Sequence, residues 1–263
     1  MSYSPVIIIT GASRGIGKAT VIEALTKFDA KVVAVARNED TLKQVHDQVS
    51  KEFNKGDCLE LVVGDVTDPS LAQKAVKAAV DKWGRLDSII VNAGVLEPIA
   101  SIAEGSVEQW KRLYDVNVFS VITLVQASLP HLRQSEKGSI IIVSSGAALK
   151  GYKGWGAYGS SKAAVNHIAS TLEAEEKDVT TIAIRPGVVD TDMQDAIRST
   201  GGDAMKEDHA KFMQLHSEGK LLKPETPGHV LAALAHNPPK ELSGLMVEWN
   251  HEKLKDYQRS EKN

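Results

Sequence analysis

Residues 6–20, which read VIIITGASRGIGKAT, contain the stretch that decides the fold. The apolar run that opens it is too short for a helix and is typical of a buried strand. Three glycines then fall in the turn between this strand and a following helix. Glycine is required there because a side chain would obstruct the tight turn, the approach of a pyrophosphate to backbone N–H groups, or the packing of helix on strand. A chance glycine-rich turn is the alternative, but the strand–glycines–helix context predicts a dinucleotide site built from Gly11, Ser13, Arg14, Gly15, Ile16 and Gly17.

The rest of the chain alternates between short apolar runs and amphipathic stretches such as residues 39–53 and 70–83. Strands that are apolar on both faces and are separated by helices favour a parallel sheet covered by helices on each side. We therefore predict an α/β fold of the Rossmann type, doubly wound, with a seven-stranded parallel sheet. The expected strands are VIII (6–9), KVVAVA (31–36), LELVV (59–63), DSIIV (87–91), SIIIV (139–143), TTIAI (180–184) and GLMVEW (244–249).

Composition narrows the function. The 263 residues suit one domain spanning the whole chain, and a net charge of −3 predicts no nucleic-acid partner and favours a small-molecule one. Cys58, the single cysteine, is expected in the core of a strand and cannot supply a metal cluster, so no metal is expected. The N-terminal apolar run is too short for a signal core or a membrane span, which makes the cytoplasm the expected compartment and a membrane partner unexpected.

One region departs from the regular alternation. Residues 190–224 are charged and weakly helical, and they follow the sixth strand at the edge where such sheets bind ligands. We predict a substrate-side lid here. A surface helical hairpin without function is the alternative.

The second strand carries information on the cofactor. About twenty residues beyond the glycine loop, an NAD site usually places an acidic residue on the ribose, and Ala36 and Arg37 stand there instead. The Arg37 guanidinium can bind a 2′-phosphate, and Arg14 can reach the same phosphate from the glycine loop. NADPH is therefore favoured over NADH, with two solvated arginines as the alternative.

The ends of the third and fourth strands extend the predicted cofactor site. Asp65 is expected to accept a hydrogen bond from the adenine amino group and Val66 to pack against the ring. Asp65 capping the next helix is the alternative, although Asp68 before Pro69 is better placed for that task. The second group is Asn92, Ala93 and Gly94, where small residues let backbone lie against the cofactor.

Tyr158 and Lys162 are four residues apart and share one face if their segment is helical. A positive charge near a tyrosine stabilises the phenolate and lowers its pKa, which would suit the phenol for proton transfer. By itself this spacing is common on helix faces. Ser145, at the end of the fifth strand and thirteen residues before Tyr158, makes it informative because strand ends on this edge hold ligands.

The set TGASRGIG, NAG, Asn117, Ser145 and YGSSK, followed by RPGVVDTDMQ, resembles the short-chain dehydrogenase/reductase family over nearly the whole chain. The resemblance implies that Tyr158 is the general acid/base, that Lys162 assists it and binds the nicotinamide ribose, that Ser145 orients the substrate carbonyl, and that Asn117 holds a water in a proton relay. It also implies a nicotinamide site at Pro186, Gly187, Val189 (or Val188) and Thr191, and a homodimer or homotetramer formed through helices that flank the sheet. The alternatives are a polar helix residue for Asn117 and a helix cap for Thr191.

Two positions depart from the family pattern: Val91 replaces an asparagine that often precedes the NAG motif, and the acidic residue of NAD sites is absent at Ala36 and Arg37. Neither removes a catalytic group. The run PGVVDTDMQ looks particularly like that of benzil and sepiapterin reductases, whose substrates carry adjacent carbonyls on or near rings. Trp155 and Met193 are the expected apolar walls for such a substrate, with core packing as the alternative.

These observations predict an NADPH-dependent carbonyl reductase that transfers hydride to a ketone or a 1,2-dicarbonyl, with Tyr158 as the proton donor. Two rivals remain open. One is an NADP(H)-binding sensor or scaffold with little turnover. The other is an alcohol-oxidising dehydrogenase, because the same groups can run the reaction backwards.

Overall fold

The computed structural model describes residues 3–259. Its centre is one seven-stranded sheet in the order β3-β2-β1-β4-β5-β6-β7, and every pair of neighbouring strands is parallel. The predicted doubly wound α/β fold is thereby confirmed, and every expected strand is present within a few residues of its predicted bounds. The strands are β1 (Val6–Thr10), β2 (Lys31–Ala36), β3 (Leu59–Val63), β4 (Ser88–Val91), β5 (Ser139–Val143), β6 (Thr180–Arg185) and β7 (Met246–Glu248).

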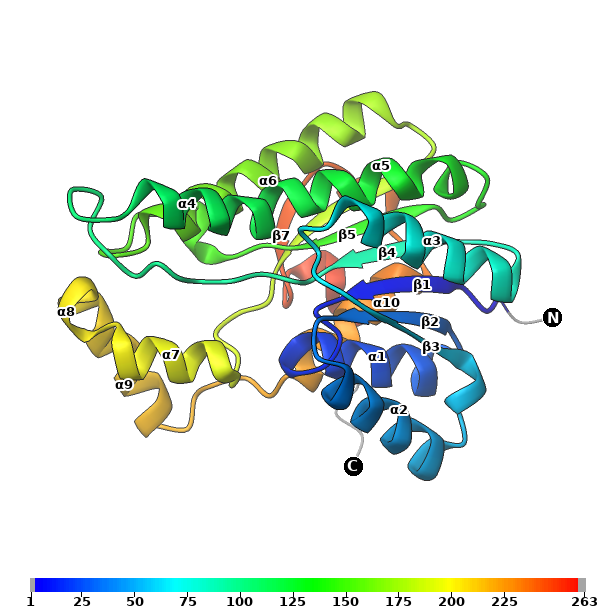
Figure 1. The fold of residues 1–263 in the computed structure, drawn as a ribbon, viewed down its shortest axis with the longest axis horizontal. Helices are drawn as coiled ribbons and strands as arrows, with labels where there is room; N and C mark the ends of the chain where they lie inside the picture. Colours follow the sequence, from blue (N-terminus) through cyan, green and yellow to red (C-terminus); the bar gives the residue numbers. More distant parts are fainter. Residues whose placement is uncertain (1–2, 260–263) are drawn as a thin grey trace.

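Helices cover both faces of the sheet (Figure 1). Alternation within each strand decides which helix packs where: Ile7 and Ile9 join the core beneath one helical layer, whereas Val6 and Ile8 join the core beneath the other. The first layer consists of α1 (Gly15–Lys27), α2 (Glu39–Phe53) and α10 (Glu225–His236). The second consists of α3 (Pro69–Trp83), α5 (Ser120–Leu132) and α6 (Gly156–Glu175), with α4 (Val107–Tyr114) continuing into α5 through a π-helical turn.

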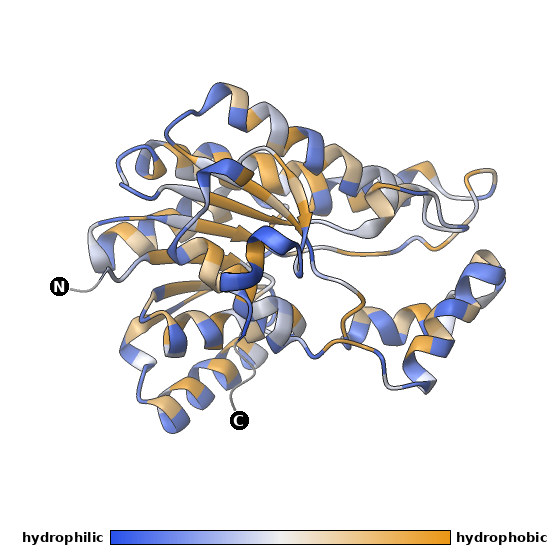
Figure 2. Ribbon diagram, turned by 180° about the vertical axis from the view of Figure 1, so that it is seen from behind, coloured by the Kyte–Doolittle hydropathy of each residue, from blue (hydrophilic) through white to orange (hydrophobic). Residues whose placement is uncertain are grey.

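The strands differ in burial according to their place in the sheet. The five residues of β1 and the five of β5 are all buried, as expected for central strands. Figure 2 shows the apolar sheet between helices that carry both apolar and polar residues. The edge strand β3 is only partly buried, and Val63 at its end is exposed. The prediction that Cys58 lies in a strand was wrong: it lies in a short 3-10 helix (Gly56–Cys58) before β3 and is half-buried, because the edge of the sheet has no neighbouring strand to cover it.

The strand order places the ligand-binding edge. The chain runs outward from β1 to β3 and then returns to place β4 on the other side of β1, so the loops after β1 and β4 diverge at the carboxyl edge of the sheet. Open α/β sheets bind their ligands in the crevice formed at this point. The glycine loop after β1, the NAG turn after β4 and Ser145 after β5 therefore meet at one edge.

Residues 190–222 form a projection that Figure 1 shows apart from the helical layers. It contains α7 (Asp192–Thr200), α8 (Gly202–Met205) and α9 (Glu207–Ser217), and we call it the α7–α9 segment. Its two ends are joined by a backbone bridge between Val189 and Leu222. The weakly helical character expected from the sequence is present, and the segment leaves and rejoins the fold at one point.

Among residues 3–259, one helical stretch, Val107–Leu132, is long and apolar enough to cross a membrane by length and composition. Half of its most apolar window is buried inside the fold, where Leu124 and Val125 belong to the core under α5. The apolar character of the stretch is that of a core helix.

Candidate active site

The glycine loop is closely packed and leaves the start of α1 free of side-chain caps. A Cβ on Gly17 would lie 2.1 Å from the Gly11 carbonyl oxygen, so only glycine permits this approach of helix to strand. Side chains cap α2 and α3, where Asn38 and Asp68 accept hydrogen bonds from the first turn, but the N-cap of α1 is Arg14 and its side chain makes no such bond. Backbone N–H groups at the start of α1 are thus available to an anion.

Asn92 holds this loop in place. Its side-chain amide donates to the carbonyl oxygens of Thr10 and Gly11, at 3.0 and 3.3 Å, and the Thr10 hydroxyl accepts from the N–H groups of Asn92 and Ala93. The sequence predicted Asn92 in the cofactor site because Asn92, Ala93 and Gly94 form a turn of small residues. In the structure, its side chain ties the turn after β4 to the glycine loop.

At the expected adenine end, Asp65 is engaged by its own turn. One carboxylate oxygen accepts from the backbone N–H and the hydroxyl of Thr67, and the backbone hydrogen bond is the main cause that holds the pKa of Asp65 below its usual value. Asp68 caps α3, as the sequence favoured. Asp65 does not cap α3, and it lies just after β3, where the adenine contact was predicted.

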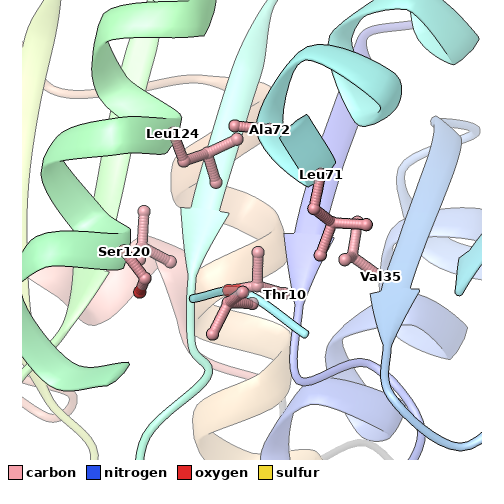
Figure 3. A pocket seen from close by; sticks show the side chains of 8 residues that line it. Thr10, Val35, Leu71, Ala72, Ser120 and Leu124 are labelled. Atoms are coloured by element: carbon pink, nitrogen blue, oxygen red, sulfur yellow. The ribbon is translucent and has the colours of Figure 1, made fainter. Parts of the chain in front are cut away.

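A small cavity lies beneath this end of the site, between the sheet and helices α3 and α5 (Figure 3). Its volume, about 20 Å³, is enough for one water molecule. Val66 lines it together with the side chains labelled in Figure 3: Thr10, Val35, Leu71, Ala72, Ser120 and Leu124. Val66, predicted to pack against the adenine ring, thus borders a mostly apolar cavity.

The two arginines expected at a 2′-phosphate are both exposed and both face a carboxylate. Arg14 Nη1 donates to Asp192 Oδ2 at 2.6 Å, and Arg37 Nη1 lies 3.9 Å from Asp65 Oδ2. Both side chains are largely solvated, as the alternative held, and each also lies near a carboxylate. The pairing of Arg14 with the first residue of α7 had no signal in the sequence.

Tyr158 and Lys162 lie on the buried face of α6, as their spacing predicted. They are 7% and 6% exposed, and Lys162 Nζ lies 5.9 Å from the centroid of the Tyr158 ring. Lys162 Nζ donates to the carbonyl oxygen of Val143, the last residue of β5, at 2.8 Å. Ser145 is two residues further on, and its hydroxyl lies near enough to the Tyr158 phenol to influence the pKa of that phenol. The same hydroxyl accepts from the Ala147 N–H at 3.2 Å. The end of β5 therefore brings Ser145, Tyr158 and Lys162 together.

The pKa of Tyr158 is raised, whereas the sequence predicted that it would be lowered. Burial raises the pKa of this phenol, and the nearby Ser145 hydroxyl opposes the rise without reversing it. The expected lowering by Lys162 is not among the causes that act on the phenol, and burial lowers the pKa of Lys162 itself to about 8. The protein alone thus favours a protonated phenol beside a lysine that gives up its proton readily.

Asn117 lies in a π-helical turn (Asp115–Phe119) between α4 and α5. Its side-chain oxygen accepts from the Val95 N–H, and its amide donates to the Val95 carbonyl and to the Ser161 hydroxyl. A Cβ on Gly94 would lie 3.4 Å from Asn117 Oδ1 and 3.5 Å from Lys162 Nζ, so both groups border the space that this glycine leaves open. The Asn117 side chain therefore hydrogen-bonds to backbone, as expected for a polar helix residue. It does so close to Lys162.

The turn after β6 carries the residues predicted to contact the nicotinamide, which lie within 186–191. Gly187 has φ +83°, and its neighbours leave no space for a side chain, since a Cβ there would lie 2.6 Å from a Leu222 methyl group. Thr191 occupies the N-cap position of α7, as the helix-cap alternative held, but its side chain makes no cap hydrogen bond. Its hydroxyl donates to the Val189 carbonyl. Its methyl group lies against the glycine loop, 3.1 Å from the position of a Cβ on Gly15.

Trp155 and Met193, the predicted walls for the substrate, belong to one apolar cluster. Trp155 is buried in an aromatic cluster with ring centroids 5.7 Å from Tyr158, 5.1 Å from Tyr152 and 5.1 Å from Phe212 of α9, and Met193 packs against the same group. The sequence did not indicate Tyr152 or Phe212, because segments 60 residues apart carry no shared pattern. An open hollow of about 630 Å³ borders the cluster, and its lining includes Trp155 but not Tyr158.

The residues of the site suit a nicotinamide dinucleotide. The uncapped start of α1, the space held by small residues after β4, and the buried lysine beside Tyr158 occur along one edge of the sheet. Gly11, Ile16 and Gly17 would lie along the pyrophosphate, and Lys162 and Thr191 would lie at the nicotinamide end.

Comparisons with known proteins agree with this geometry. Residues 5–202 match the family model described as short chain dehydrogenase. The chain is 42% identical over 260 residues to a benzil reductase ((S)-benzoin forming) of Saccharomyces cerevisiae, covering 95% of this chain and 97% of that protein. A crystal structure of a short chain dehydrogenase/reductase from the same yeast is 42% identical, with a TM-score of 0.90, over 97% of this chain and 100% of the other.

A second solved structure, of a short chain dehydrogenase from Shigella flexneri complexed with NADP, is 26% identical with a TM-score of 0.77, over 93% of this chain and 96% of the other. The matched family model covers both the glycine loop and the Tyr158–Lys162 pair. The chain thus belongs to the short-chain dehydrogenase family, whose members bind nicotinamide cofactors, and it is an oxidoreductase that acts on CH–OH or C=O groups.

Proposed function

We propose that this protein is an NADPH-dependent carbonyl reductase that reduces a ketone or a 1,2-dicarbonyl, with Tyr158 as the proton donor. The observation that carries the proposal is the convergence of Ser145, Tyr158 and Lys162 at the end of β5, beside the crevice between β1 and β4. A nicotinamide cofactor bound in that crevice supplies hydride to the carbonyl carbon.

The side chains of this chain would handle the oxygen. Ser145 donates a hydrogen bond to the carbonyl oxygen and Tyr158 gives it a proton, so that the negative charge developing on the oxygen is neutralised as it forms. Burial keeps the Tyr158 phenol protonated, so it carries the proton that the reduction needs. Lys162 lies beside the Tyr158 ring and Asn117 lies close to the lysine, so the two residues are in a position to relay a proton back to the phenol.

The preference for NADPH is supported by the absence of an acidic residue at Ala36 and Arg37 and by the positions of Arg14 and Arg37. A guanidinium binds a phosphate through paired, charge-assisted hydrogen bonds. The Shigella relative crystallised with NADP is consistent with the same choice.

The substrate class is supported by the aromatic cluster of Tyr152, Trp155, Tyr158 and Phe212, which suits a flat or aromatic ketone. The yeast benzil reductase points to the same chemistry. We further propose that the α7–α9 segment is a lid, because Ile197, Met205 and Phe212 bury the same cluster that contains Tyr158. Substrate would reach Tyr158 when this segment moves.

The family relation supports an assembly of two or four copies, which we propose for this chain. A cytoplasmic protein of Saccharomyces cerevisiae that is 40% identical to this chain supports a place in the cytoplasm, which we also propose. The whole chain 1–263 would then be one catalytic domain with its lid at residues 190–224.

The decisive experiment is a panel of carbonyl compounds, with benzil, other 1,2-dicarbonyls and simple monoketones, assayed with NADPH and with NADH. The expected result is reduction of the dicarbonyls with a lower KM for NADPH than for NADH. Tight NADPH binding without turnover across the panel would favour the sensor instead. Preferential oxidation of alcohols with NAD would favour the dehydrogenase.

A further inference from the structure

Arg14 links two parts of the molecule that are 178 residues apart in sequence. Its guanidinium leaves the glycine loop and donates to the carboxylate of Asp192, the first residue of α7, at 2.6 Å. The two side chains are 70% and 66% exposed, so solvent and ligands can reach both. The contact joins the glycine loop, where the cofactor is proposed to bind, to the start of the α7–α9 segment.

The backbone keeps Asp192 within reach of this arginine. Thr191 lies against Gly15, and the base of the α7–α9 segment is held by hydrogen bonds from the Asp190 N–H to the Leu222 carbonyl and from the Leu222 N–H to the Val188 carbonyl, at 2.8 and 2.9 Å. A carboxylate in the first turn also suits the positive end of the α7 dipole, which favours this position for it.

We propose that Asp192 is a determinant of cofactor selectivity that competes with the 2′-phosphate of NADPH for Arg14. The inference rests on the proposed use of NADPH. Arg14 carries one positive charge, and in this structure a carboxylate already neutralises it. A 2′-phosphate must take the guanidinium from Asp192 or share it, and either lowers the affinity for NADPH. NADH has no 2′-phosphate and does not enter this competition.

The same exchange connects the cofactor to the lid. When Arg14 turns to the phosphate, Asp192 loses its partner and the α7–α9 segment loses its ion pair with the glycine loop. Loading of NADPH therefore weakens one contact that holds the segment against the crevice, and loading of NADH leaves that contact intact.

The test compares dissociation constants for NADPH and NADH, measured by calorimetry, in the wild type and in Asp192→Asn. Asp195→Asn is the matched control, since Asp195 is an exposed acidic residue on the same helix that pairs with Arg198 rather than with Arg14. We expect Asp192→Asn to raise the preference for NADPH, expressed as Kd(NADH)/Kd(NADPH), by about two- to fivefold, the effect of freeing one exposed ion-pair partner. Asp195→Asn should leave the ratio unchanged.

A double-mutant cycle assigns the effect to Arg14. In an Arg14→Gln background, Asp192→Asn should no longer change the ratio. Equal tightening of both cofactors in Asp192→Asn, or an equal gain in Asp195→Asn, would show general charge removal and overturn the inference. An unchanged ratio would overturn it as well.

The two proposals fail separately. If the wild type binds NADH as tightly as NADPH, the proposed cofactor is wrong, whatever the variants do. If the wild type prefers NADPH and Asp192→Asn does not strengthen the preference, the cofactor stands and the role of Asp192 is wrong.

Discussion

Asp87 and Lys162 are buried charges at opposite edges of the same sheet, and their partners differ completely. Asp87, just before β4 at the amino edge, accepts hydrogen bonds from the Arg85 guanidinium, the Ser135 hydroxyl and the Val6 N–H, at 2.6 to 3.1 Å. Lys162, at the carboxyl edge, donates to the neutral carbonyl of Val143 and pairs with no carboxylate among residues 3–259. One charge is fully partnered, and the other is not.

The difference separates structure from function. The hydrogen bonds from a guanidinium, a hydroxyl and a backbone N–H offset much of the free energy that desolvation of the Asp87 carboxylate costs. They also connect β1 and β4 to the segment before β5. The single neutral acceptor of the Lys162 ammonium does not offset the cost of its desolvation in this way, and the pKa of Lys162 falls to about 8 as a result. Perturbed groups of this kind cluster at functional sites, and this one lies beside Tyr158.

The largest expected effect comes from removing the proton donor at the carboxyl edge. Tyr158→Phe should slow ketone reduction by about 10²- to 10⁴-fold, the range for loss of a positioned general acid. The ring keeps its packing against Trp155, so NADPH affinity and thermal stability should change little. Steady-state kinetics, NADPH titration and a melting curve check the three parts, and turnover within tenfold of the wild type would refute the role of Tyr158.

The next effect should appear at the amino edge and should be one of stability. Asp87→Ala leaves Arg85 and the buried Val6 N–H without their partner and should lower the free energy of unfolding by about 3–5 kcal/mol. The turnover of the folded molecules should not change. Urea denaturation measures the loss, and Asp81→Ala, which removes an exposed acid paired with Lys77, is the control and should cost about 0.5 kcal/mol or less. If Asp87→Ala lowered the free energy of unfolding by less than about 1 kcal/mol, the structural role assigned to Asp87 would be wrong.

The smallest expected effect is a dependence on pH set by Lys162. Because its pKa is about 8 and that of Tyr158 is raised, the lysine loses its proton first, and kcat/KM for ketone reduction should be level below pH 8 and fall by up to about tenfold per pH unit above it. A profile that stays level to about pH 9.5 would contradict the lowered pKa of Lys162.

Stability should respond to the same lysine in the opposite sense. The unfolded lysine titrates near 10.4, so below pH 8 the folded state bears the full cost of the buried charge, about 3 kcal/mol at most, and this cost disappears between pH 8 and 10.4. Lys162→Met should therefore be more stable than the wild type at pH 7, and its advantage should shrink as the pH rises through that window. Denaturation of both proteins at pH 7 and at pH 10 measures the difference.

Local patterns predicted most of the fold and the core of the site. The apolar runs predicted strands close to their observed bounds, because a strand buried between two helical layers is apolar on both faces. The spacing of Tyr158 and Lys162 placed both on one helix face, because the helical repeat fixes that geometry. Cys58 was misplaced, because an edge strand buries less of its flanks than a central one.

The interactions that the sequence did not predict are those between distant segments. The π-helical turn at Asn117, the contact of Phe212 with Trp155 and the pair of Arg14 with Asp192 all depend on elements that meet only in the folded chain. The pKa of Tyr158 belongs here too, since its direction depends on how completely α6 and the α7–α9 segment exclude water.

The sequence by itself determined which residues form strands, which turn must be glycine, and which side chains reach the carboxyl edge of the sheet. These follow from the periodicity of each element and from the parallel order of the strands. Only the tertiary structure decided how charges are partnered: Asp87 with three donors, Lys162 with one carbonyl, and Arg14 with Asp192. Periodicity acts between neighbours in the chain, whereas desolvation and charge pairing act between neighbours in space.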